Sequence, residues 1–196
     1  MIIAVEGMDG VGKTTICKYI EKRFNFIYID KPTKYLFEDN QGKIDYEKFY
    51  RTLDKVYKLN EESRTIFFGK GNLIAVTKYP DKDIVIDRHL VSNYYWNSNK
   101  GLYNYYDELI KTCGKPDITI YLYASPKERY KRLKERNQND LDLYDQTVFE
   151  DELEKVLEFL NDFDFEYKII DTNNKSIEDV CHEVENIIKV KKKIHK

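Results

Sequence analysis

The sequence contains little cysteine and no long hydrophobic segment. Its three cysteines, Cys17, Cys113 and Cys181, are widely separated, and no two of them form a C-x-x-C pair. We therefore expect no disulfide framework and no zinc site, and a reducing, cytoplasmic compartment fits best. No apolar run approaches ~18 residues, so the sequence predicts no membrane span. The apolar segment 1–6 is too short for the core of a signal peptide, and acidic residues follow it directly.

The sequence also lacks an excess of charge of either sign. It has 33 Lys and Arg against 35 Asp and Glu, which gives a formal net charge of -2. Nucleic-acid-binding proteins usually show a basic excess or stripe, so we expect no nucleic-acid partner. A small anionic substrate needs only a local cluster of cations. The basic segment 189–196, KVKKKIHK, is interpreted as a solvated helix end or tail.

No repeat, low-complexity segment or linker divides the 196 residues, and we expect one domain spanning residues 1–196. Short apolar runs alternate with longer charged stretches, which is typical of an α/β fold with a parallel sheet covered by helices. The expected strands are Ile2–Glu6, Phe26–Asp30, Ile84–Asp87, Asp117–Tyr123 and Tyr167–Asp171. The expected helices are Thr14–Phe24, Asp45–Leu59, Glu62–Lys78, Tyr103–Thr112, Pro126–Arg136, Gln146–Phe163 and Ser176–Lys189.

A phosphate-binding loop follows the first expected strand. Residues 7–14, GMDGVGKT, match G-x-x-x-x-G-K-[ST] at every fixed position, between a hydrophobic strand and a helix-forming run. Glycines let the backbone curl so that successive N–H groups point at a polyphosphate, and the next helix adds its positive N-terminus. Lys13 would neutralise the β- and γ-phosphates of ATP, and the Thr14 hydroxyl would ligate Mg²⁺. The predicted ATP-binding residues are Gly7, Met8, Asp9, Gly10, Val11, Gly12, Lys13, Thr14 and Thr15.

Two acidic positions accompany this loop. Asp9 lies inside it, where a carboxylate repels phosphates unless it holds a substrate hydroxyl or a magnesium-bound water; the alternative is a solvated loop acid. Asp87 and Arg88 follow the third expected strand, whose carboxyl end should lie beside the loop. An acid for the metal next to a cation for the travelling phosphate is what phosphoryl transfer requires. A surface ion pair is the competing interpretation.

Three ordered motifs give the sequence a resemblance to the thymidylate kinase family over nearly the whole chain. They are residues 3–15 (IAVEGMDGVGKTT), residues 87–93 (DRHLVSN) and residues 170–180 (IDTNNKSIEDV). The resemblance implies a three-layer P-loop kinase fold, with a five-stranded parallel sheet flanked by helices and a mobile lid. It also implies a homodimer and Mg²⁺-dependent transfer of phosphate from ATP to dTMP.

The resemblance suggests roles for residues near the acceptor phosphate. Asp9 would meet the 3′-hydroxyl of the acceptor sugar or the metal shell, and Arg88 would hold the acceptor phosphate. Lys34 stands where the family has a phosphate-binding arginine. A lysine supplies the charge without the bidentate fork of an arginine.

The resemblance also suggests residues around the acceptor base. Phe68 corresponds to a phenylalanine that stacks on thymine, although either it or Phe67 could be ordinary core. Asn93 and Trp96 align with residues that contact the acceptor nucleotide, and Trp96 would favour deoxyribose by crowding the 2′ position, unless it is core filler. Asn72 replaces a usual arginine; it can hydrogen-bond a base edge but cannot neutralise charge.

The expected lid spans approximately residues 132–147. Arginines spaced three and four apart give residues 126–136 a basic helical face, and because the phosphate loop lacks an arginine, the expected catalytic cations are Arg132 and Arg136 together with Lys13 and Arg88. A solvated amphipathic face is the competing interpretation. Tyr144 belongs to a segment that resembles the lid's acid-x-Tyr-acid pattern, with Leu143 in place of an arginine.

Three functions therefore stand at this point. The leading hypothesis is a nucleoside-monophosphate kinase that converts dTMP to dTDP, with Thr14 and Asp87 at the metal. A deoxynucleoside kinase would phosphorylate a 5′-hydroxyl instead, and needs a general base that related kinases supply as a Glu after the second strand; this chain has Lys31 and Pro32 there. A nucleotide-binding module without turnover would not need Asp87, Arg88 and an arginine-bearing lid.

Overall fold

The computed structural model describes residues 1–137, 143 and 149–194. Five parallel strands form one sheet in the order β2-β3-β1-β4-β5. Their bounds are β1 Ile2–Glu6, β2 Ile27–Asp30, β3 Ile84–Asp87, β4 Ile118–Tyr123 and β5 Tyr167–Asp171. The predicted five-stranded parallel sheet is confirmed, and only β2 and β4 begin one residue later than expected.

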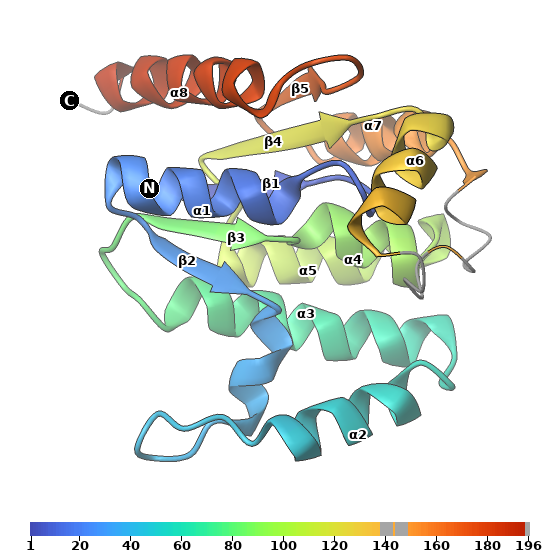
Figure 1. The fold of residues 1–196 in the computed structure, drawn as a ribbon. Coiled ribbons are helices and arrows are strands. Elements are labelled where there is room, and N and C mark those ends of the chain that lie inside the picture. The colour runs from blue at the N-terminus through green and yellow to red at the C-terminus, as the bar shows by residue number, and fades with distance from the viewer. Residues whose placement is uncertain (138–142, 144–148, 195–196) are drawn as a thin grey trace.

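The register of the sheet brings the predicted motifs to one edge. β1 lies in the centre, with Val5 paired to Asp87 of β3 and Glu6 paired to Tyr121 of β4. All strands are parallel, so their carboxyl ends share one edge, which is where ligands bind in open α/β sheets. The loop after β1 and the residues after β3 therefore emerge side by side (Figure 1).

Helices cover both faces of the sheet, which makes three layers (Figure 1). The helices are α1 Lys13–Phe24, α2 Tyr46–Val56, α3 Glu61–Thr77, α4 Leu90–Asn97, α5 Tyr103–Cys113, α6 Pro126–Arg136, α7 Leu153–Asp162 and α8 Ile177–Ile194, with 3-10 turns η1 Pro32–Phe37 and η2 Lys100–Leu102. Alternate strand residues divide between the faces, as the pleat requires. Ile3 and Val5 pack with α1 and α8 on one side, whereas Ile84 and Ile86 pack against Ala75 of α3 on the other.

Two helical expectations needed correction. Helix α4 was not expected, although it follows Arg88 directly and carries two of the expected site residues. The helix expected from Gln146 begins at Leu153, and its residues 146–148 lie outside the described part of the chain. Residues 150–152 precede the helix, and their side chains accept hydrogen bonds from tyrosines on α4 and β4.

The chain ends in a long helix, as expected. Ser176 and Asp179 cap it reciprocally, with the Asp179 N–H donating to Ser176 Oγ at 3.1 Å and the Ser176 N–H donating to the Asp179 carboxylate at 3.2 Å. Helix α8 continues to Ile194, so the described part of the basic run is a helix end. Lys189, Lys191 and Lys192 pair with acids, the last of them with Asp83 at 3.0 Å. None of the helices in the described ranges is long and apolar enough to cross a membrane.

Candidate active site

The loop after β1 has the backbone that a phosphate cradle needs. Gly7, Gly10 and Gly12 adopt φ values of 132°, 85° and 96°, a region that residues with a Cβ rarely enter. A Cβ at Gly7 would stand 2.3 Å from the carbonyl oxygen of Leu122, so the loop also passes too close to β4 for a side chain. Helix α1 starts at Lys13, and its positive N-terminus closes the loop.

Lys13 lies inside this cradle. Its side chain is 6% exposed, and its ammonium donates a hydrogen bond of 2.7 Å to the carbonyl of Met8 and lies 3.8 Å from Asp9. Burial, followed by the nearby Arg88, lowers the pKa of Lys13 to about 8. Asp9 balances the charge of this buried ammonium only in part, because it lies 3.8 Å away. An incoming anion would stabilise the charged form, so the geometry suits a polyphosphate.

Thr14 and Asp87 lie together at the start of α1 and the end of β3. The Thr14 hydroxyl donates to Asp87 Oδ2 at 2.8 Å, and the Tyr28 hydroxyl reaches the same oxygen at 3.3 Å. A hydroxyl and a carboxylate are oxygen ligands of the kind that Mg²⁺ takes alongside water and substrate phosphates. Within the described ranges no cluster of three or more His, Cys, Asp or Glu side chains could hold a metal ion.

Arg88 faces Asp9 across the cradle. Its backbone has a φ of 71°, and its N–H donates to the Val5 carbonyl at 3.1 Å, which turns the guanidinium over the loop. The guanidinium hydrogen-bonds the Asp9 carboxylate and lies 5.9 Å from the ring of Trp96. Burial favours a raised pKa of Asp9, but Arg88 and then Lys13 outweigh it and lower that pKa. Asp9 is therefore ionised and neutralised in part by both cations.

Glu6 is a site-forming residue that the sequence analysis missed. It is fully buried at the end of β1, and its carboxylate accepts from the backbone N–H groups of His89 at 2.8 Å and Val91 at 3.1 Å. It also accepts from the Ser92 N–H and hydroxyl, so it caps the N-terminus of α4 and fixes the position of Arg88. Burial raises the pKa of Glu6, partly offset by these hydrogen bonds. The position of this acid directly before the phosphate loop is the sequence feature that could have identified it.

The next residue, His89, is buried in a different way. Neither ring nitrogen has a hydrogen-bond partner within the described residues, and burial lowers the pKa of His89 to about 3. The imidazole is therefore neutral at physiological pH. It supplies no charge to the neighbouring phosphate site.

Aromatic side chains gather where the acceptor base was expected. The rings of Phe68 and Phe67 meet edge to face with centroids 5.4 Å apart, and neither is fully buried, so neither is simple core. Tyr57, which the sequence analysis missed, lies 6.0 Å from Phe68 and is exposed. Desolvation of its hydroxyl raises the pKa of Tyr57 although much of the side chain is exposed, and nearby Arg88 lowers that pKa. The hydroxyl therefore lies within the electrostatic range of the Arg88 guanidinium. Its position at the end of α2 gave no local signal.

Asn93 and Trp96 lie on α4. Asn93 is buried, donates to the Thr65 carbonyl at 3.2 Å and accepts from Asn97 at 3.4 Å. Its amide donor is thus used to join α4 to α3. Trp96 is half-buried, meets Tyr95 edge to face at 5.1 Å and lies beside Arg88. Of the two, Trp96 has the side chain nearer to the phosphate loop.

Lys34 was expected to be a phosphate-binding cation. It lies on η1, largely buried, and its ammonium forms an ion pair with Asp30 at the end of β2. It also lies 5.3 Å from the ring centroid of Tyr35. Lys34 therefore stands at the carboxyl edge of the sheet with part of its charge neutralised.

The arginines of α6 do not form one solvated face. Arg132 donates to the Thr172 carbonyl at 2.6 Å, to its hydroxyl at 3.0 Å and to Glu128 at 3.0 Å, so it joins α6 to the end of β5. Arg136, at the end of α6, acts electrostatically on Asp9 and lowers its pKa after Arg88 and Lys13 have done so. Of the two predicted lid arginines, Arg136 is the one with this influence on the phosphate loop. Tyr144 and most of the expected lid lie outside the described residues.

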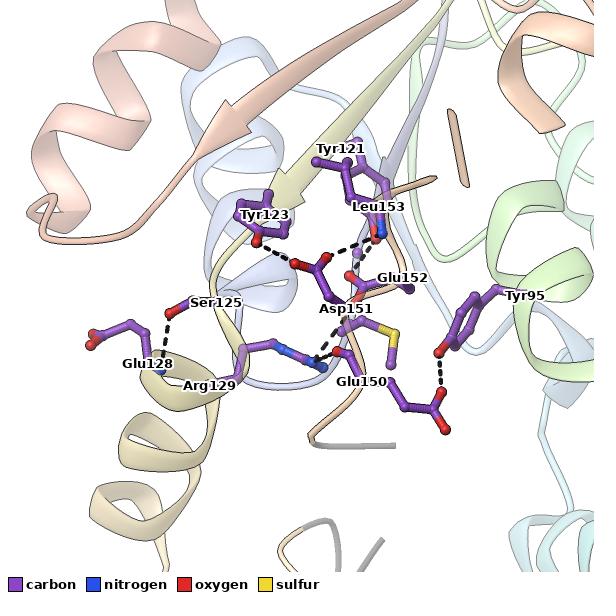
Figure 2. A network of polar contacts seen from close by, with 12 residues as sticks. Tyr95, Tyr121, Tyr123, Ser125, Glu128, Arg129, Glu150, Asp151, Glu152 and Leu153 are labelled. Carbon is purple, nitrogen blue, oxygen red and sulfur yellow. Dashed lines mark hydrogen bonds and ion pairs between the residues drawn. The ribbon is translucent and has the colours of Figure 1, made fainter. Parts of the chain in front are cut away.

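Arg129, the first arginine of the same face, is buried, and Figure 2 shows its polar contacts. Its guanidinium donates to the Glu150 carbonyl and lies 3.7 Å from Glu152, whose other oxygen accepts from the Tyr121 hydroxyl at 2.7 Å. A Cβ at Gly10 would stand 3.0 Å from the Arg129 carbonyl oxygen. Arg129 therefore links the phosphate loop to the segment just before α7.

Two more tyrosines fasten that segment. Tyr95 of α4 donates to Glu150 at 2.6 Å, and Tyr123 of β4 donates to Asp151 at 2.9 Å (Figure 2). The residues that lead into α7 are thus held by α4, β4 and α6 together. Through Arg129 they are joined to the part of α6 that lies against Gly10 of the loop.

These features together define a P-loop nucleotide kinase. They are a glycine loop at the end of the central strand, a buried lysine, an oxygen pair at the end of the neighbouring strand and an arginine over the loop. The thymidylate kinase family model matches residues 5–184. A probable thymidylate kinase of Methanocaldococcus jannaschii is 27% identical over 195 residues, which cover 96% of each chain.

Solved structures show the same fold. A thymidylate kinase from Candida albicans superposes with a TM-score of 0.70 at 20% identity, covering 97% of this chain and 92% of that one. A deoxyadenosine kinase from M. mycoides superposes with a TM-score of 0.63 at 22% identity, covering 97% and 99%. Because the family model matches most of its length, the chain belongs to the thymidylate kinase family, and it is a nucleoside-monophosphate kinase.

Proposed function

We propose that this enzyme transfers the γ-phosphate of ATP to dTMP and releases ADP and dTDP, with Mg²⁺. The observation that carries the proposal is the convergence of Lys13, the Thr14–Asp87 oxygen pair and Arg88 on one loop at the carboxyl edge of the sheet. Phosphoryl transfer depends on positioning and charge stabilisation more than on covalent chemistry, and these groups supply both.

The donor side follows from the phosphate loop. The N–H groups of loop residues 7–15 would surround the phosphates of ATP. Lys13 would contact the β- and γ-phosphates, and their negative charge would raise its pKa again and keep the ammonium protonated. Thr14 and Asp87 would hold Mg²⁺, which neutralises charge on the phosphate oxygens when bound. Arg136 would contribute further positive charge at the same loop, and Arg132 would hold α6 against β5.

The acceptor side depends on Arg88. Its guanidinium is already held in place by a hydrogen bond to the Asp9 carboxylate. An acceptor phosphate would bind the remaining N–H groups of this guanidinium. Asp9 would then be available to the 3′-hydroxyl or the metal shell. Phe68 and Tyr57 would bracket the base, and Trp96 would lie against the sugar.

Coupled ADP release with a panel of ribo- and deoxynucleoside monophosphates tests the proposal. We expect dTMP to be a substrate and TMP, its ribose counterpart, to be poorer. Lys13→Met should lower kcat by about 10²–10³-fold, the loss typical of one removed charge-stabilising donor. The dTMP assignment is wrong if another monophosphate is turned over while dTMP and dUMP are not.

A deoxynucleoside kinase is the second candidate, and one observation favours it. Asp30 ends β2 directly beside Asp87 of β3, with its side chain 45% exposed, so a carboxylate does stand where a general base for a 5′-hydroxyl would be needed. Its ion pair with Lys34 argues against that role because the lysine neutralises the charge of the base. Thymidine in the same assay separates the two candidates, since only a nucleoside kinase would phosphorylate it.

Membership of the family also favours a cytoplasmic homodimer. Light scattering coupled to size-exclusion chromatography would measure the mass in solution. A mass of about twice the 23.5 kDa chain is expected.

A further inference from the structure

Asn72 occupies a defined position on α3. Successive residues of a helix turn by about 100°, so Asn72 points within about 20° of Thr65, two turns earlier. The Thr65 hydroxyl donates to the Asn97 carbonyl at the end of α4 at 2.8 Å. The neighbouring Gly71 lies against η1, where a Cβ would meet the Thr33 side chain at 2.5 Å. Asn72 therefore faces the space between α4 and η1.

This space lies at the carboxyl edge of the sheet. Helices α3 and α4 run antiparallel (Figure 1), and Asn72 lies about 10 Å along α3 from Thr65, which is the distance from Asn97 back to the start of α4. Arg88 immediately precedes that start. The Asn72 amide thus lies near the residues that follow β3, one turn from Phe68.

The amide of Asn72 is buried without a partner for its donor. The residue is 4% exposed, and Nδ2 has no hydrogen bond to any of the described residues. An unpaired buried donor costs about 1–3 kcal/mol. An acceptor on the edge of a nucleotide base is a group that could pair with this donor and remove the cost.

A carboxamide can present its two atoms in either order. Rotating the Asn side chain by 180° exchanges the N–H donor and the carbonyl acceptor at little cost in shape. Thymine offers an acceptor at O4 and a donor at N3–H, whereas cytosine offers a donor at N4 and an acceptor at N3. One orientation of the amide makes two hydrogen bonds to thymine, and the other makes two to cytosine.

We propose that Asn72 reads the base edge in both orientations, so that the enzyme accepts 4-amino as well as 4-oxo deoxypyrimidine monophosphates, dCMP beside dTMP. This inference rests on the proposed function and extends it to the base. An arginine at this position could only donate, and would leave the cytosine amino group facing other donors. The neutral amide removes that discrimination.

The first test compares kcat/KM of the unaltered enzyme for dTMP, dCMP and a deoxynucleoside monophosphate with an unsubstituted 4-position. We expect dTMP and dCMP to lie within about tenfold of each other, and the unsubstituted analogue to be about tenfold or more below both, because it loses one hydrogen bond. A selectivity for dTMP over dCMP above 10³-fold would overturn the proposal. Selectivity of that order arises when the wrong substrate leaves a buried polar group of the site without a hydrogen bond.

The second test uses Asn72→Asp, which has the same shape but only accepts when ionised. The ratio of kcat/KM should shift towards dCMP by about 10²-fold at pH 7.5, and the shift should shrink at lower pH as the carboxyl gains a proton. Asn97→Asp is the matched control: it places a carboxyl in a buried position on α4 and should leave the ratio unchanged. An unchanged ratio in Asn72→Asp refutes base reading by this residue.

The analogue series needs no variant, so it decides the question even if Asn72→Asp folds poorly. Turnover of dTMP with rejection of dCMP overturns this inference alone. Absence of turnover with every monophosphate removes the proposed function and this inference together.

Discussion

Replacing Arg129 by methionine should show how strongly the attachment of residues 150–152 to α6 depends on one buried ion pair. The side chains of Arg129 and Glu152 are each only 1% exposed. Removing one partner of such a pair typically costs about 3–5 kcal/mol, because the other charge stays buried without compensation. Glu152 keeps the hydrogen bond from Tyr121, and it can take up a proton, so we expect the lower end, about 3 kcal/mol at pH 7.5.

The deficit should depend on pH. Burial raises the pKa of Glu152, so the folded protein holds a proton at pH values where the unfolded chain has lost it. Such a group contributes most stability below its unfolded pKa, and the contribution is lost as pH rises through the folded pKa. Without Arg129 the folded pKa rises further. The deficit of Arg129→Met relative to the unaltered protein should therefore be smaller at pH 5.5 than at pH 7.5.

Urea unfolding at both pH values measures this. The double variant Arg129→Met, Glu152→Gln removes the charge while keeping an acceptor for Tyr121, and it should recover about 1 kcal/mol or more of the loss. Lys131→Met is the matched control, because Lys131 is an exposed residue of the same helix and should change stability by less than about 0.5 kcal/mol. A loss below about 1 kcal/mol that does not vary with pH would refute the reasoning.

Three further predictions concern the loop and the strand end that precedes it. The Kd of ATP, measured by calorimetry, should rise with pH above about 8, because Lys13 then loses its charge; a Kd constant between pH 7 and 9.5 would contradict the lowered pKa. Glu6→Gln should lower the free energy of unfolding by about 2–3 kcal/mol, since the new NH₂ faces the donors at the start of α4; a loss under 0.5 kcal/mol in urea would show that the cap is dispensable. Gly7→Ala should abolish ATP binding, because strain at φ 132° adds to a Cβ 2.3 Å from Leu122, whereas Gly114→Ala, at φ 75° with open space, should cost about 1–2 kcal/mol and keep binding; equal effects would refute the steric argument.

The parts of the site that are local in sequence could be predicted, because their geometry follows from a few consecutive residues. The loop from Gly7 to Thr14 needs only its own glycines and the helix after it, and the strand ending at Asp87 is a short apolar run. Both lie where expected. Phe68 and Asn72 also share one face of a helix because they are four residues apart.

The parts that depend on distant residues could not be predicted. The spacing of Arg129 and Arg132 suggests one solvated helical face. Arg129 is instead buried against Glu152, which is more than twenty positions away along the chain. Thr172 in turn fixes Arg132. The start of α4 depends in the same way on Glu6, which is 84 positions before Leu90. A local helical pattern carries no information on these partners.

Electrostatics around Asp9 explain why an acid stands inside a phosphate loop. Three cations lower its pKa, namely Arg88, Lys13 and Arg136, in that order of strength. Asp87 and Glu6 also act on Lys13 and Arg88, so the cations around the loop are balanced in part by several acids. Of these acids, Asp9 is the one whose carboxylate hydrogen-bonds the Arg88 guanidinium and holds it across the loop. Under the proposed function, loss of Asp9 would leave Arg88 without this partner and free to turn towards an ATP phosphate held by Lys13. We therefore expect Asp9 to keep the proposed acceptor cation, Arg88, apart from the proposed donor cation, Lys13, as in-line transfer between two anions requires.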